Sequence, residues 1–167
     1  GKISQTFNLT YRNNYVYNND AFGIWLDFAY ADNNIVHNYV DNNYNSGILI
    51  EISYSDTGHR NLVQCNYVRN NGKNITSAGM DGSNIWVSNS PNTHVLQNIV
   101  IQHQNYGRGV TITDFSYRTV ENEDIYAYGT RVYQNHILML GGQGSYGISG
   151  GETDRDRATF FSFSTNQ

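Results

Sequence analysis

Two carboxylates close two matching phrases of the sequence, and a pair of carboxylates can perform acid–base chemistry. The phrases are Gly23-Ile-Trp-Leu-Asp27 and Gly47-Ile-Leu-Ile-Glu51, so the carboxylates are 24 residues apart. If both phrases form strands that stack in register, the two backbones lie about 4.8 Å apart. A retaining glycosidase needs two carboxyl groups about 5–5.5 Å apart, one as nucleophile and one as acid/base. The spacing therefore predicts a hydrolytic pair, and two solvated carboxylates on a strand face are the alternative.

Two tryptophans occupy one position of these phrases, in Gly23-Ile-Trp25 and Asn84-Ile-Trp86. Strict alternation sends the aliphatic residues of each phrase to one face of a strand and the tryptophans to the other. The aliphatic face belongs in a core, so we expect Trp25 and Trp86 to face solvent, where indole rings can stack on sugars. Coverage of both rings by a loop from 72–83 or 114–129 is the alternative.

Two tyrosines one period apart, Tyr30 and Tyr54, extend the predicted substrate-binding set. Identical residues on neighbouring turns come within ring-stacking distance, so we expect them to form an aromatic ladder on a bend. The five histidines are scattered over different repeat positions, and His37 with Cys65 supplies too few ligands for a tetrahedral metal site. No spacing supports a calcium-binding carboxylate cluster either, so no metal or cofactor is expected, and calcium is the alternative.

The elements that must position these residues repeat along the chain. A column of asparagines recurs at Asn14, Asn38, Asn66, Asn98 and Asn135, and an aliphatic residue stands two positions after each. A fixed period of this size indicates stacked supersecondary units. We therefore predict an all-β parallel solenoid of about five turns, each with three short strands and three bends. Buried asparagine amides would bond to the next asparagine and to turn backbone.

Composition agrees with short strands separated by turns. The 167 residues include 24 Asn, 16 Gly and 14 Tyr, and they suit one domain. The net charge of −4 argues against a nucleic-acid partner, and no basic amphipathic helix suggests a membrane surface. We expect coils over residues 1–140, with insertions near 72–83 and 114–129. Residues 141–167 would add a Gly-rich segment and a closing strand to the same domain.

The phrases N-x-V-x-N-N and G-I, over residues 8–140, resemble the right-handed parallel β-helix family of pectate lyases and polygalacturonases. Within that family, GIWLD and GILIEIS on successive turns are similar to β-helix glycoside hydrolases of the xylosidase type. The resemblance implies that Asp27 is the nucleophile and Glu51 the acid/base. It also implies a carbohydrate partner, an extracellular or cell-surface location, and hydrolysis in preference to polysaccharide lysis.

A second function fits the same repeats. The open ends of a coil expose strand edges, which are templates for pairing with another chain. A non-catalytic structural or adhesive β-helix would use these edges to self-associate end to end into fibres or spikes.

Overall fold

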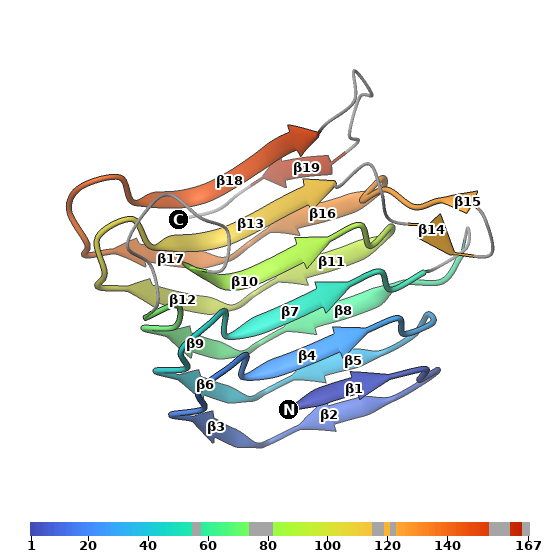
Figure 1. Cartoon of the computed structure of the whole chain (residues 1–167), viewed down its shortest axis with the longest axis horizontal. Coiled ribbons are helices and arrows are strands. Elements are labelled where there is room, and N and C mark those ends of the chain that lie inside the picture. The colour runs from blue at the N-terminus through green and yellow to red at the C-terminus, as the bar shows by residue number, and fades with distance from the viewer. Residues whose placement is uncertain (55–57, 74–81, 115–118, 121–122, 154–160, 165–167) are drawn as a thin grey trace.

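The chain folds as a right-handed parallel β-helix built from three parallel sheets (Figure 1). The computed structural model describes residues 1–54, 58–73, 82–114, 119–120, 123–153 and 161–164. Each of the first five coils passes once through sheets A, B and C, and sheets A and B each gain a sixth strand above them. The predicted fold class is thereby confirmed. In the part of the chain that the structure describes, no helix is long and apolar enough to cross a membrane.

Each sheet takes one strand from each successive coil. Strands that are neighbours in a sheet are therefore not consecutive in the sequence. Sheet A contains β1 (Lys2–Ser4), β4 (Ile24–Asp27), β7 (Ile48–Glu51), β10 (Ser83–Ser88), β13 (Arg108–Asp114) and β18 (Tyr146–Thr153). Sheet B contains β2 (Thr10–Arg12), β5 (Asn34–Val36), β8 (Asn61–Gln64), β11 (Thr93–Leu96), β16 (Thr130–Tyr133) and β19 (Phe161–Ser164). Sheet C contains β3 (Tyr15–Tyr17), β6 (Tyr39–Asp41), β9 (Tyr67–Arg69), β12 (Ile99–Gln102) and β17 (His136–Met139). A hairpin of β14 (Thr119–Val120) and β15 (Glu123–Asp124) stands apart from the three sheets.

The core runs up the centre of the coil as columns of aliphatic side chains. Ile24 pairs in register with Ile48, and Ile48 with Ile85, and all three are buried. Sheets B and C contribute equivalent columns through Val63 and Val68. Each column arises because alternation sends every second residue of a strand inward.

The bends between sheets depend on left-handed backbone. Residues immediately before the ladder asparagines adopt positive φ, among them Asn13, His37, Cys65, Gln97 and Gln134. Asn tolerates this conformation because its short side chain can bond locally, and other residues adopt it at a cost. One such residue turns the chain from sheet B into sheet C, whereas the bend from sheet A to sheet B contains two, such as Phe28 and Asp32.

The predicted asparagine column forms a continuous buried ladder. Asn38 receives the Nδ2 of Asn14 at 3.1 Å on its Oδ1, and its own Nδ2 donates to Asn66 Oδ1 at 3.0 Å. The ladder continues through Asn98 to Asn135 with the same geometry. Each Oδ1 also accepts the backbone N–H of the preceding asparagine, as Asn66 does from Asn38. The ladder thereby satisfies polar backbone groups that would otherwise be buried without partners.

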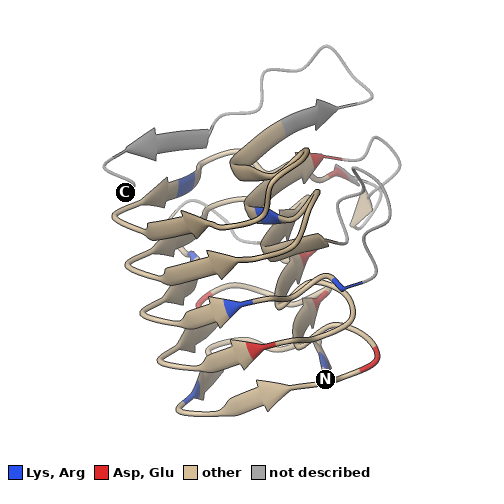
Figure 2. Cartoon of the chain, turned by 90° about the vertical axis from the view of Figure 1, so that its left-hand side faces the viewer, with Lys and Arg blue, Asp and Glu red and all other residues tan. Residues whose placement is uncertain are grey.

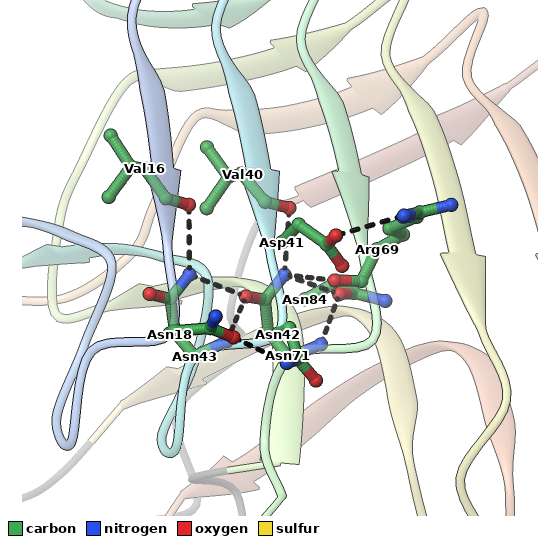
Figure 3. A network of polar contacts seen from close by, with 9 residues as sticks. All are labelled: Val16, Asn18, Val40, Asp41, Asn42, Asn43, Arg69, Asn71 and Asn84. Atoms are coloured by element: carbon green, nitrogen blue, oxygen red, sulfur yellow. Dashed lines mark hydrogen bonds and ion pairs between the residues drawn. The ribbon is translucent and has the colours of Figure 1, made fainter.

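A second ladder lies at the bend from sheet C to sheet A and was not predicted. It begins with Asn19, which donates to Asn43. It continues from Asn43 through Asn71 to Asn84 (Figure 3). A Cβ at Gly47 would lie 2.5 Å from Asn71 Nδ2, so the ladder excludes a side chain there. Asn84 stands at the position of that glycine one coil later, and its own amide continues the ladder. A third, shorter ladder joins Asn33 to Asn61.

The outer face of sheet C carries a row of tyrosines, one from each of three successive coils. Tyr39 stacks on Tyr67 with ring centroids 4.9 Å apart, and Tyr15 meets Tyr39 edge-on. Beside them, Arg69 donates to Asp41 at 3.0 Å and forms an ion pair between neighbouring coils (Figure 3). This hydrogen bond raises the pKa of Arg69. Other charges on the side seen in Figure 2 are sparse and scattered over the coils.

Candidate functional site on the outer face of sheet A

The two candidate carboxylates are direct neighbours on adjacent parallel strands. β4 and β7 pair with Asp27 opposite Glu51 and with Trp25 opposite Leu49. This is the register that the matching phrases predicted. Leu26 and Ile50, which precede the carboxylates, are buried in the core, so both carboxylates lie on the outer face. Both are half-buried.

Lys2 is a partner of Asp27 that the sequence analysis missed. Its Nζ lies 2.5 Å from Asp27 Oδ2 and 4.1 Å from the centre of the Trp25 ring. The ammonium offsets the repulsion between two adjacent carboxylates. A signal was available in the sequence, because Lys2 precedes an aliphatic residue just as Trp25 does, and the two pair in register.

Glu51 is held by a different group. The indole Nε1 of Trp25 donates to Glu51 Oε2 at 3.1 Å. Phe22 packs against the same indole, with ring centroids 5.0 Å apart. One carboxylate is therefore paired with a cation and the other with a neutral donor. Two carboxyl groups in unlike environments are suited to different roles in one reaction.

A cleft of about 400 Å³ opens beside these residues at the first coils. Lys2, Asp20, Phe22 and Trp25 are among the residues that line it. Its wall includes the ammonium of Lys2, the carboxylate of Asp20 and the rings of Phe22 and Trp25. Such a mixture of apolar walls and a few polar groups is usual for a small-ligand site.

Trp86 does not share the exposure of Trp25, and the prediction that it faces solvent is wrong. It is 8% exposed, and its Nε1 donates to Thr113 Oγ1 at 2.9 Å. Leu49 and Thr111, which pair in register with Trp86 on the outer face, are 2% and 1% exposed. Alternation fixes which way a side chain points, but not what packs outside it. Trp25 is consequently the tryptophan with an accessible ring.

The predicted tyrosines lie on the bend that follows the carboxylate strands. Tyr30 and Tyr54 are both exposed, and the backbone N–H of Tyr30 donates to Thr6 O in the first coil. Their binding role remains a prediction. Next to them, His59 Nδ1 lies 2.6 Å from Asp32 Oδ2. This contact with His59 lowers the pKa of Asp32.

Among the described residues, no group of three or more His, Cys, Asp or Glu side chains could hold a metal ion. Comparison with known proteins adds no further assignment. No family model, no curated protein and no solved structure matches the chain.

Proposed function

We propose that the outer face of sheet A around Trp25, Asp27 and Glu51 binds a carbohydrate and hydrolyses it with retention. The observation that carries the proposal is the register of β4 and β7, which puts the two carboxylates side by side on adjacent strands. Asp27, paired with Lys2, would attack the anomeric carbon. Glu51 would protonate the leaving oxygen and then activate water. The Trp25 ring and the adjoining cleft would hold a sugar.

A carbohydrate ligand agrees with the chemistry of this face. Sugar rings present apolar C–H faces to aromatic rings and hydroxyls to charged groups. Trp25 and Phe22 supply the rings, while Asp20 and Lys2 supply polar groups at the cleft. Polysaccharides of cell walls and coats lie outside cells, so we place the protein in the extracellular space or at a cell surface.

Substitution of each carboxylate tests hydrolysis. Asp27→Asn and Glu51→Gln are assayed separately on a panel of p-nitrophenyl glycosides, with the parent protein alongside. We expect each to lower kcat by at least about a hundredfold, the range of a positioned acid–base group. Asp41→Asn, which removes the carboxylate paired with Arg69 on sheet C, is the matched control and keeps parental activity. An inactive parent, or full activity in both variants, overturns the proposal.

End-to-end assembly is the second candidate function, and one observation favours it. β1, β2 and β3 lie at the edges of the three sheets, where a further coil could add to each. Analytical ultracentrifugation and electron microscopy distinguish the two candidates. Filaments with the axial repeat of the coil support assembly, and a monomer at high concentration argues against it.

A further inference from the structure

The residues that directly follow the two carboxylates share an unusual backbone conformation. Phe28 follows Asp27 with φ of 53°, and Ile52 follows Glu51 with φ of 48°. Bulky and β-branched residues rarely adopt this left-handed conformation, because Cβ comes too close to the following carbonyl oxygen. In the first and fourth coils, the same position is taken by Gln5 and Asn89, with φ of 55° and 45°.

Stacking of the bends locks this conformation in place. The N–H of Phe28 donates to Glu51 O at 3.0 Å, and that of Ile52 donates to Ser88 O at 3.0 Å. Below them, the N–H of Gln5 donates to Phe28 O at 3.2 Å. The bend itself needs only a residue that tolerates left-handed backbone, as Asn89 shows. The side chains of Phe28 and Ile52 are therefore not explained by the bend that they occupy.

Strained backbone persists where the surrounding structure enforces it, and it gathers at ligand sites. Here the strain coincides with apolar side chains that the core does not use. Phe28 is 36% exposed and Ile52 is half-buried, and neither belongs to the central aliphatic columns. Two residues further along the chain, Tyr30 and Tyr54 are also exposed. An apolar and aromatic edge thus runs beside the ends of β4 and β7.

We propose that Phe28 and Ile52 form an apolar wall of the ligand site and contact the sugar whose scissile bond lies over Asp27 and Glu51. This inference rests on the proposed carbohydrate function and assigns two further binding residues to it. Both residues directly follow the carboxylates at the ends of β4 and β7, so their side chains would border the ligand. The wall selects the C–H face of a pyranose.

The test uses Phe28→Asn and Ile52→Asn, which suit the bend and remove the wall. Turnover is measured on the p-nitrophenyl glycoside that the parent hydrolyses best. Binding of xylo-, cello- and galacturono-oligosaccharides is measured by calorimetry. We expect KM and Kd to rise about threefold to tenfold with kcat unchanged, the range of one aromatic contact. Phe28→Tyr, which keeps the ring, restores KM, and Gln5→Asn at the same bend of the first coil leaves it unchanged.

The unfolding midpoint in urea supplies a readout that binding does not affect. Phe28→Asn relieves backbone strain but removes a partly buried ring, and its midpoint shows whether the variant is still folded. Unchanged KM and Kd in both Asn variants, in a parent that binds a sugar, overturn the wall while the proposed function stands. A parent that binds none of the oligosaccharides and hydrolyses none of the glycosides overturns both. If the parent binds a sugar but hydrolyses none of the glycosides, only the proposed hydrolysis is overturned. The Kd values of the two Asn variants then test the apolar wall.

Discussion

The two halves of the outer face of sheet A differ although their strands share one register. In β4 and β7, Asp27 and Glu51 are half-buried and take Lys2 and Trp25 as partners. In β10 and β13, every residue is buried on both faces. Hydroxyl groups there bond to each other, as Ser83 Oγ does to Thr111 Oγ1 at 2.6 Å. A repeat thus fixes the direction of a side chain, and the surroundings of each coil decide its chemistry.

The two tryptophans give the largest expected contrast between the halves. Trp86→Ala removes a buried ring and its hydrogen bond to Thr113, so we expect a loss of about 3–5 kcal/mol in the free energy of unfolding. Trp25→Ala removes a half-buried ring from the open half and costs about 1–2 kcal/mol. Urea unfolding followed by circular dichroism measures both. Equal losses would mean that the halves do not differ in packing.

The buried hydroxyl chain gives the next effect. Thr111 Oγ1 accepts from Ser83 and lies 2.9 Å from Ser149 Oγ. Thr111→Val keeps the shape and removes the hydroxyl, and we expect a cost of about 1–3 kcal/mol because polar partners stay buried. Ser4→Ala, on the exposed strand β1, is the control and changes stability by less than about 0.5 kcal/mol. A neutral Thr111→Val would show that the chain of hydroxyls contributes nothing.

The ion pair between Lys2 and Asp27, beside the half-buried strands β4 and β7, contributes less to the free energy of unfolding. A double-mutant cycle with Lys2→Met and Asp27→Asn is expected to give a coupling of about 0.2–1 kcal/mol, because the Lys2 side chain is 48% exposed. The coupling falls as salt is raised toward 1 M, where the screening length is about 3 Å. A coupling that stays constant over this range contradicts the description of this half as open to solvent.

The smallest effect concerns pH. Contact with His59 lowers the pKa of Asp32 below 3.8, so the folded state favours the ionised carboxylate. Its contribution to stability is present above pH 3.8 and is lost as pH falls through the folded-state pKa. Asp32→Asn should therefore flatten the acid limb of the stability profile slightly. NMR titration of Asp32 in His59→Gln should show its pKa returning toward 3.8, and an unchanged pKa rules out His59 as the cause.

The fold could be predicted because the residues that stack in columns recur at fixed positions of a sequence repeat. Phrases such as Asn38-Tyr-Val-Asp-Asn-Asn43 recur with aliphatic residues at fixed offsets, and parallel stacking in register follows from the recurrence. The pair of Asp27 and Glu51 follows from the same reasoning. The second ladder was within reach, since Asn43 and Asn71 close copies of that phrase.

Other features depend on three-dimensional surroundings that a repeat does not encode. Trp86 and Trp25 occupy one column, yet packing outside the sheet buries Trp86 and leaves Trp25 accessible. The left-handed backbone at Phe28 and Ile52 contradicts their intrinsic preferences, so only stacking of the bends reveals it. The cleft beside Trp25 likewise depends on the positions of Asp20 and Phe22, which the repeat does not specify.

The link between Asn71 and Asn84 has a practical consequence for changing this protein. Their side chains bond at 2.9 Å across only 13 positions, whereas Asn43 and Asn71 are 28 positions apart. The amide contact thus joins the residue that follows β9 and its bend to the start of β10. Any redesign of this protein should accordingly keep Asn71 and Asn84 together, because the contact between them carries the ladder from one coil to the next.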